Sequence, residues 1–468
     1  MRIPILSGAY TDAAANFRVS YPVNYFVSVG QNGISDAYLR PADGLVQVGT
    51  GPGVSRGAIE WNGEHYRVMG PMLVKISSSG LVTQLGFVGG FNEPVKMDYS
   101  FDRLAIASVG NLYYYDGTTL SQVTDPDLGQ VIDVVFVDGY FMTTDGQSIV
   151  VTELSNPAQV NPLKYGSSEA DPDRLVSILK VRNEPHAINL HTIEAFDNVG
   201  GDYFPFQRIE GAQIMKGCVG SRACCLFVDA IAFVGSGRGE SPSVYIGANG
   251  RAQQISTNEI DLVLSAYSDA ELANVVLEPR NNKSQQLLYV HLPDRTLVYD
   301  ATASQIVGAP VWSVLTSTLG ESFTQYKARD FVWCHGKWWA GDPTSNVFGT
   351  LTDSIGSHWG ANVRWEFSTP IVYNAGKGAI IHQIELSALT GRVVSGLDPT
   401  LSTSYSTDGI TWSNTRHIKA GQQGERMKRL VWWQNGFMRS WRVQRFQGDT
   451  QTHLSVAALE AEIEGLAV

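Results

Sequence analysis

Short runs of apolar and polar residues alternate along most of the chain, and turn residues separate them at close intervals. In the stretch 65–76, for example, two such runs flank the turn residue Gly70. A period of two bounded by Gly, Asp or Asn predicts antiparallel strands joined in hairpins. Apolar patterns of helical length are almost absent. The hydrophobic pattern therefore predicts an all-β fold.

The hairpin pattern repeats over most of the sequence. Copies begin near residues 65, 103, 140, 186, 231, 286 and 337, so successive starts lie about 37 to 55 residues apart. This spacing fits one four-stranded β-propeller blade per copy, with loop insertions in the later blades. Each hairpin has an apolar face that it cannot bury alone, and a ring of hairpins buries them all. We predict a propeller of about seven blades, with six or eight left open.

A short helical patch interrupts the repeat. Residues 258–264 and 268–272 carry acidic first turns and predict two short helices. Asn258 and Ser268 are the expected N-caps, because Asn and Ser side chains accept hydrogen bonds from the free N–H groups of a first turn.

From about residue 356 the strands continue without blade-like spacing, which is typical of a β-sandwich-like domain. The predicted division is an N-terminal arm (1–36), the β-propeller (37–355) and the C-terminal β-sandwich-like domain (356–468). A stretch within 37–48 is expected to supply a strand that closes the propeller.

Composition narrows the class of protein. The chain has 468 residues, and its net charge is 34 − 45 = −11, so it lacks the basic excess of proteins that grip nucleic-acid phosphates. No sustained apolar segment suggests a secretory signal or a membrane span. The expected protein is soluble, made in a reducing cytoplasm, with Cys218, Cys224, Cys225 and Cys334 as free thiols.

Several segments occur in a specific order and spacing between residues 242 and 315. They are Pro242-Ser243-Val244-Tyr245-Ile246, Ala266-Tyr267-Ser268-Asp269-Ala270-Glu271, His291-Leu292-Pro293, Leu297-Val298-Tyr299-Asp300-Ala301, Ser304-Gln305 and Val311-Trp312-Ser313-Val314-Leu315. Nearer the N-terminus stand Tyr38-Leu39-Arg40-Pro41, Gly53-Val54-Ser55-Arg56-Gly57 and Tyr66-Arg67-Val68-Met69-Gly70. With these segments the chain resembles the tail hub, or packaged-DNA stabilisation, proteins of P22-like short-tailed phages. Residues 120–220 carry little of the likeness.

The resemblance implies a structural role and a set of partners. It implies a homo-hexameric ring, or nozzle, that joins the virion tail beneath the portal and its adaptor ring after DNA packaging. The ring would close the portal channel, stabilise the packaged DNA, receive the tail needle or plug and contact the tailspikes. DNA would pass through without sequence-specific binding, and assembly would take place in the host cytoplasm, away from any membrane.

The sequence offers no convincing catalytic, metal or cofactor site. Residues 406–412 resemble the Asp-box turn of sialidases, one residue short, and Asp408-Gly409 by itself favours a hairpin turn. The Gly-rich stretch 235–240 is followed by a predicted strand instead of the helix that a phosphate-binding loop needs, so we expect a hairpin loop.

Two clusters of potential ligands are also weak. The thiols of Cys218, Cys224 and Cys225 lack the second ligand pair of a structural zinc site and are interpreted as small hydrophobic side chains. Glu460, Glu462 and Glu464 would share one face of a strand, with no sign of a cleft to hold two facing carboxyls.

Six residues are candidates for contacts with partner proteins: Trp338, Trp339, Trp432, Trp433, Arg439 and Arg442. In each Trp pair on a strand, one ring is expected to face the core and the other to face outward, where aromatic rings anchor interfaces. Plain packing within or between blades stays the alternative. The basic residues between 426 and 445 fit an acidic partner or DNA, or an ordinary solvated surface.

Two other functions remain open. One is a propeller enzyme that acts on host surface glycans, which would need convergent carboxylates or an Arg cluster at the mouth of the propeller. The other is a binding propeller that recruits host proteins.

Overall fold

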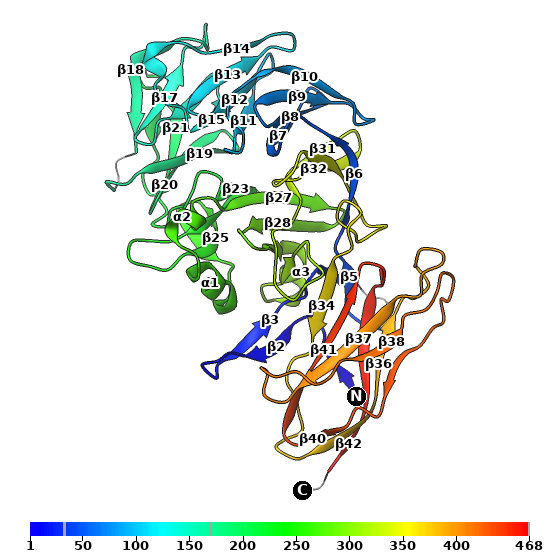
Figure 1. The fold of residues 1–468 in the computed structure, drawn as a ribbon. Coiled ribbons are helices and arrows are strands. Elements are labelled where there is room, and N and C mark those ends of the chain that lie inside the picture. Colours follow the sequence, from blue (N-terminus) through cyan, green and yellow to red (C-terminus); the bar gives the residue numbers. More distant parts are fainter. Residues whose placement is uncertain (31–33, 169–170, 202, 467–468) are drawn as a thin grey trace.

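The structure, a computed structural model, describes residues 1–30, 34–168, 171–201 and 203–466, and it is mostly β-strand (Figure 1). This confirms the predicted all-β class. Figure 1 shows the propeller sheets in the upper part and the sandwich at the lower right, with both ends of the chain at the sandwich.

The described residues form seven four-stranded antiparallel sheets before residue 353. The first sheet consists of β7 (Ser55–Trp61), β8 (Glu64–Met69), β9 (Met72–Ile76) and β10 (Val82–Phe87). The second consists of β11 (Lys96–Tyr99), β12 (Leu104–Ser108), β13 (Asn111–Tyr115) and β14 (Leu120–Gln122). The third consists of β15 (Asp133–Val137), β16 (Tyr140–Thr144), β17 (Ser148–Thr152) and β18 (Val160–Ser167). The next three are β19 (Leu175–Val181), β20 (Glu184–Asn189), β21 (Ile193–Asn198) and β22 (Phe206–Arg208); β23 (Cys224–Phe227), β24 (Ala230–Gly235), β25 (Ser243–Ala248) and β26 (Arg251–Gln254); and β27 (Val276–Asn282), β28 (Gln285–His291), β29 (Thr296–Asp300) and β30 (Trp312–Leu315).

The seventh sheet combines distant parts of the chain. It contains β31 (Arg329–Cys334), β32 (Lys337–Gly341) and β33 (Val347–Thr352), and β33 pairs with β6 (Gly44–Thr50) from near the N-terminus. The first strands of successive sheets contact one another, and β31 contacts β7, so the contacts run around a ring. Among the residues that the structure describes, no pairing between named strands joins one propeller sheet to the next. The seven sheets agree with the predicted number of blades, which stays a prediction.

Two-residue turns connect the first two strands of several sheets. In the turns Asn62-Gly63 and Asp138-Gly139, both residues have positive φ, between 50° and 90°. Such left-handed pairs match the twist of the strands that they join, and Asn, Asp and Gly adopt them at the lowest cost. The turn chemistry of the sequence therefore sets the hairpin registers.

The sandwich consists of two sheets. The first has the order β39 (Leu430–Trp433), β36 (Ala379–Ala388), β42 (Val456–Gly465), β5 (Ala37–Pro41) and β4 (Tyr25–Val29), with β1 (Arg2–Ile3) on β42 and β40 (Phe437–Met438) on β36. The second has the order β34 (Arg364–Ser368), β41 (Trp441–Asp449), β37 (Thr400–Ser406) and β38 (Arg416–Lys419), with β35 (Val372–Tyr373) on β41. Trp365, Phe367 and Trp432 lie in the core of this part.

Strand pairing differs from the predicted division at the N-terminus. Residues 1–36 are not a separate arm, because β1 and β4 belong to the first sandwich sheet. β5 also pairs there, although residues 37–41 had been assigned to the propeller, and only β6 closes the seventh sheet. Because β5 and β6 both alternate apolar and polar residues, the sequence pattern alone would let either strand join the sandwich sheet or the seventh propeller sheet. We propose 44–352 as the propeller, and β1, β4 and β5 together with the strands after residue 353 as the sandwich.

The N-terminal segment also links the two parts. The hairpin of β2 (Gly8–Thr11) and β3 (Phe17–Ser20) precedes Val23, whose N–H donates to the Glu366 carbonyl of β34 at 2.8 Å. The next N–H, that of Asn24, donates to the Val314 carbonyl of β30 at 2.8 Å. Two successive residues therefore tie the sandwich to the sixth propeller sheet.

The predicted helical patch is present as α1 (Asn258–Ser265) and α2 (Asp269–Leu272). Ser268 caps α2 as predicted, and its hydroxyl and Glu271 form a capping box. Asn258 is not the cap of α1: that position is Thr257, one residue earlier. The chain also has α3 (Ala301–Val307), capped by Asp300, and the 3-10 turn η1 (Pro126–Leu128).

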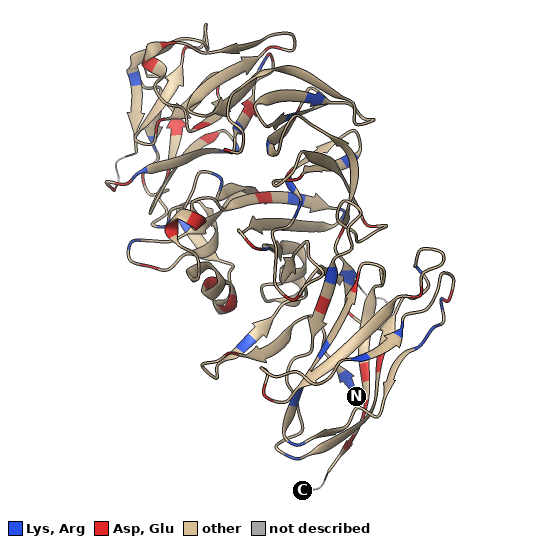
Figure 2. Ribbon diagram, in the orientation of Figure 1, with Lys and Arg blue, Asp and Glu red and all other residues tan. Residues whose placement is uncertain are grey.

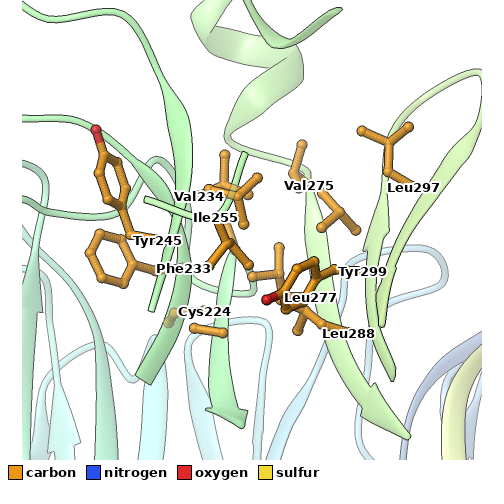
Figure 3. Packing of buried hydrophobic residues seen from close by; sticks show 14 of the residues in the cluster. Cys224, Phe233, Val234, Tyr245, Ile255, Val275, Leu277, Leu288, Leu297 and Tyr299 are labelled. Atoms are coloured by element: carbon orange, nitrogen blue, oxygen red, sulfur yellow. The ribbon is translucent and has the colours of Figure 1, made fainter. Parts of the chain in front are cut away.

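The largest hydrophobic cluster joins the fifth and sixth propeller sheets (Figure 3). Phe233 and Tyr245 stack with their ring centroids 5.4 Å apart, and Leu277 and Leu288 pack on the neighbouring sheet. Cys224 lies in the same cluster. This packing holds the fifth and sixth sheets against each other.

Candidate functional site

The first strands of the propeller sheets surround a cavity of about 510 Å³. Its lining comes from six sheets and includes Ile59, Lys96, Leu179, Cys224, Cys225, Glu278, Asp330 and Trp338. Acidic and basic residues are interspersed along the ribbon of both parts of the chain (Figure 2). At this cavity, several of them meet in buried ion pairs.

Arg222 precedes β23 and connects four of the sheets at the axis. Its Nη2 lies 2.7 Å from Asp330 Oδ1 on β31 and 3.3 Å from Glu278 Oε1 on β27. Its Nη1 donates to the Arg56 carbonyl on β7 at 3.2 Å. Asp330 also accepts a hydrogen bond from Ser55, and its backbone carbonyl accepts one from Arg67.

A second buried cluster joins the remaining three sheets. Lys96 Nζ of β11 lies 3.2 Å from Asp133 Oδ2 of β15 and 3.3 Å from Ser177 Oγ of β19. The Asp133 carboxylate also accepts from the Ser177 hydroxyl. The inner strands of all seven sheets, or residues directly beside them, therefore take part in one of two polar clusters around the axial cavity.

The ion pairs keep the axial carboxylates charged. Burial raises the pKa of Asp330, but the guanidinium groups of Arg222, Arg329 and Arg67 outweigh this effect and hold that pKa well below its usual range. Burial likewise raises the pKa of Glu278, while His291 and Arg222 bring it below the ordinary value. A general acid needs a raised pKa, whereas the pKa values of Asp330 and Glu278 both lie below normal.

A groove of about 850 Å³ lies beside the axis, between the sixth and seventh sheets, and Trp333 and Trp338 are part of its wall. The two rings face each other across β31 and β32 with centroids 5.5 Å apart. Trp333 is 54% exposed, and the guanidinium of Arg280 lies 5.7 Å from the Trp338 ring. Charged residues of both signs, among them Lys337 and Asp353, also line this groove. Its exposed Trp333 ring gives it the aromatic character of a protein-contact surface.

Of the pair Trp338 and Trp339, for which one outward ring is predicted without saying which, Trp338 is the half-buried ring that lines the groove. Trp333 is not among the residues predicted from the sequence. The signal for Trp333 was in the sequence, because the turn His335-Gly336 places residues 333 and 338 opposite each other on adjacent strands. A cross-strand partner of a candidate residue is thus also a candidate.

Three of the six predicted interface residues are buried within the chain. Trp339 is 1% exposed, and its indole N–H donates to the Cys334 carbonyl at 3.1 Å. Trp432 lies in the sandwich core. Arg442 donates to the Asn435 carbonyl, and its guanidinium stacks on Tyr405 at 3.9 Å. Their burial removes these three side chains from any partner surface, because each fills a site in its own domain.

Trp433 and Arg439 are exposed on the sandwich, and Trp433 has 56% of its surface accessible. Trp432 and Trp433 thus divide between core and surface as the alternation of a strand requires. The structure does not bring Trp433 near the groove of Trp333 and Trp338, which lies on the propeller. The chain therefore has two separate candidate surfaces.

The motifs without a catalytic assignment have structural roles. Asp408 Oδ1 accepts from the N–H groups of Ile410 and Thr411 at 2.9 and 2.8 Å, which confirms the predicted turn. The Gly409 carbonyl of this turn accepts from Thr11 N–H at 3.2 Å and so docks the β2–β3 hairpin on the sandwich. The Gly-rich stretch 235–240 connects β24 and β25, as predicted for a hairpin loop.

The remaining clusters carry no assembled site. Glu460, Glu462 and Glu464 are exposed on β42. Within the described residues, no group of three or more His, Cys, Asp or Glu side chains is arranged to hold a metal ion. No helix in the described part of the chain has the length and apolar character needed to span a membrane.

Comparisons with known proteins agree with this architecture. A family model described as "Bacteriophage P22 Gp10, beta-propeller" matches residues 1–356, and a second, "Bacteriophage P22 Gp10, beta-sandwich", matches residues 364–464. The chain is 29% identical to the "Tail hub protein gp10" of Salmonella phage P22 over 460 residues, which is 94% of each chain.

Solved structures show only distant likeness. The WD40 β-propeller domain of Doa1 is 11% identical, with 66% of this chain and 97% of that chain covered and a TM-score of 0.42. PorZ of Porphyromonas gingivalis is 11% identical over 80% of this chain and 46% of that one, with a TM-score of 0.38. The assignment rests on the two family models, which together span the propeller and the sandwich. The chain therefore belongs to the bacteriophage P22 Gp10 family, with a β-propeller followed by a β-sandwich.

Proposed function

We propose that this chain is the structural hub, or nozzle, of a short phage tail. The observation that carries the proposal is the likeness to the P22 tail hub protein over 94% of both chains, which includes both domains. In this role the chain acts mechanically. It closes the exit channel below the portal, retains the packaged DNA and holds the other tail parts in place.

The channel lies between copies of the chain and not through one propeller. Arg222 and Lys96 occupy the axis in buried ion pairs, which leaves no passage for a DNA duplex. A homo-hexameric ring, as the family resemblance implies, would enclose the channel instead. The net charge of −11 favours sliding of DNA over retention by the wall, since like charges repel.

The two exposed aromatic surfaces are the proposed contact sites for partners. Trp333 and Trp338 mark one on the propeller, and Trp433 with Arg439 marks the other on the sandwich. The partners would be the portal adaptor, the tail needle or plug and the tailspikes. Repeated around a ring, individually weak contacts give a firm attachment through avidity.

An enzymatic role is the less favoured alternative. A propeller glycosidase needs two carboxyls facing a sugar-binding cleft, whereas Glu278 and Asp330 are committed to Arg222 at the axis. A turnover assay of the purified chain on host surface polysaccharide distinguishes the two roles. Release of reducing ends, lost on substitution of an exposed carboxylate, would support the enzyme.

Blocking translation of the gene during infection tests the hub directly. The expected result is capsids that package DNA and then lose it, seen by electron microscopy as empty heads without tails. Supplying the chain from a plasmid should restore full, tailed particles. If full, tailed particles form without the chain but fail to infect, the hub role is wrong. If the hub role is right, fractionation of infected cells should also find the chain in virion tails after assembly in the host cytoplasm.

A further inference from the structure

The segment that presents Arg222 is an excursion from an otherwise continuous strand. Val219 N–H donates to the Val234 carbonyl at 3.0 Å, and Val234 N–H donates to the Ala223 carbonyl at 2.9 Å. In an antiparallel sheet these two bonds normally go to a single residue of the neighbouring strand. Residues 219–223 thus replace one strand residue, and a turn from Gly220 to Ala223 closes the excursion.

This geometry brings Cys218 and Cys224 together. They stand immediately before and after the excursion, so they take the places of residues i−1 and i+1 of one strand. Such residues lie about 6.6 Å apart at their Cα atoms and point to the same face. Disulfides in proteins join Cα atoms about 4.4 to 6.8 Å apart. Both cysteines are buried free thiols in the same hydrophobic cluster, in which Figure 3 shows Cys224.

Cys224 also faces the axial cavity, where Lys96 forms part of the same wall. The interaction with Cys218 lowers the pKa of the Cys224 thiol, burial raises it, and the Lys96 ammonium lowers it further, so that the net pKa is below normal. Burial raises the pKa of Cys218. A thiol with a lowered pKa beside a cavity is the one expected to react first with a small oxidant.

We propose that Cys218 and Cys224 are an oxidisable pair that forms a disulfide across the base of the Arg222 segment. With hydrogen peroxide as oxidant, the Cys224 thiolate attacks one peroxide oxygen, an S–O bond forms, the O–O bond breaks and hydroxide leaves. The Cys218 sulfur then attacks the Cys224 sulfur, the S–S bond forms and the S–O bond breaks. The departing hydroxide takes the Cys218 proton, so two thiols and one peroxide give one disulfide and two waters.

The disulfide would hold the residue that connects four propeller sheets. Arg222 lies between the two cysteines, and closing this short loop restricts the backbone that carries its guanidinium. The time at which this disulfide would form during the life of the virion is inferred from the proposed function. A hub leaves a reducing cytoplasm at lysis and then stays in an oxidising medium for the life of the virion.

Peptide mapping of the purified full-length chain tests the pair. After treatment with hydrogen peroxide, alkylation and digestion with trypsin, the bond should link residues 217–222 to residues 223–238, because trypsin cuts after Arg222. Cys225→Ala should keep this link, and Cys218→Ser should abolish it. A link between Cys224 and Cys225, or oxidation of Cys224 to a sulfinic acid with Cys218 still free, would overturn the proposal.

Thermal unfolding provides a second readout. The oxidised chain should unfold about 3 °C higher than the reduced chain, and Cys218→Ser should remove the difference. Equal melting temperatures with the link present would show that the bond does not stabilise the Arg222 segment. Both measurements use the isolated chain, so their outcome is independent of whether the chain is a tail hub. The gene-silencing experiment tests that role separately.

Discussion

Arg222 Nη2 and Asp330 Oδ1 lie 2.7 Å apart at the propeller axis, although 108 residues separate them in the sequence. A bulge between Arg329 and Val332 interrupts the pairing of β31 with β32, and Asp330 has a left-handed backbone with φ of 59°. Bulges turn a side chain away from the direction that strand alternation would give it. Here the turned side chain is the acceptor that Arg222 requires.

Loss of Arg222 should destabilise the propeller strongly. Arg222→Ala leaves the carboxylates of Asp330 and Glu278 buried beside fewer cations, and breaking a buried pair in this way costs about 3 to 5 kcal/mol. Urea unfolding followed by tryptophan fluorescence measures the loss. Arg238→Ala, which breaks the exposed pair with Asp171, is the control and should cause a much smaller change. Similar losses for both variants would contradict a structural role of the axial cluster.

The tryptophans of the seventh sheet should separate stability from binding. Trp339→Ala removes a ring that is 1% exposed and should cost about 3 to 5 kcal/mol of unfolding free energy. Trp333→Ala removes a ring that is 54% exposed and should cost less than about 1 kcal/mol. Only Trp333→Ala should yield a folded chain that joins virions poorly, as measured by sedimentation of assembled particles. Normal assembly of that variant would exclude the propeller groove as a partner site.

Stability should fall in mildly acidic solution because of His358. Burial, assisted by Lys327, lowers the pKa of His358 to about 3. The Nδ1 atom of the ring forms a hydrogen bond of 2.8 Å with the Ser317 hydroxyl. The unfolded chain takes up a proton near pH 6.5 while the folded chain does not, so stability present above pH 6.5 is lost as the pH falls toward 3. At pH 4 the loss from this group is about 3 kcal/mol. Urea unfolding of His358→Asn from pH 7 to pH 4 should show a shallower decline than the parent chain; an equal decline would assign the effect to other groups.

A substitution in the turn between β23 and β24 should stabilise the protein. Val228 has φ of 50° in a two-residue turn and is 53% exposed, although a β-branched side chain disfavours this backbone by about 1 kcal/mol. Val228→Asn should therefore raise the melting temperature. Asn62→Val makes the reverse change in the equivalent turn of the first sheet, where φ is 52°, and should lower it. Changes of the same sign in both variants would rule out backbone strain as the cause.

The propeller sheets were predictable because the residues that specify each hairpin lie close together in the sequence. Alternation of apolar residues and turns such as Asn62-Gly63 specify a hairpin within about ten residues, so the repeat and the change near residue 356 were visible. The order of the N-terminal strands was not, since β5 and β6 have similar patterns and differ only in the distant strands that they meet.

The axial cluster could not be read from the sequence for the same reason. Arg222 stands in a polar turn, and its partners Glu278 and Asp330 follow 56 and 108 residues later. Trp333 was within reach of prediction, because its partner Trp338 lies across a two-residue turn. Arg442 was misassigned because a buried arginine that stacks on Tyr405 has no sequence pattern that distinguishes it from an exposed one.

The pairing of β1 with β42 and of β6 with β33 imposes an order on folding during synthesis. The ribosome makes the first fifty residues early, yet their partner strands emerge only after residue 346 and after residue 455. Until then those segments have no sheet to join, and neither the ring of sheets nor the sandwich can be finished. A chain cut before residue 347 would lack both the complete ring of sheets and the sandwich, and a chain cut between residues 353 and 455 would still lack β42, the strand on which β1 pairs. The two pairings therefore delay completion of the fold until almost the whole chain has been made.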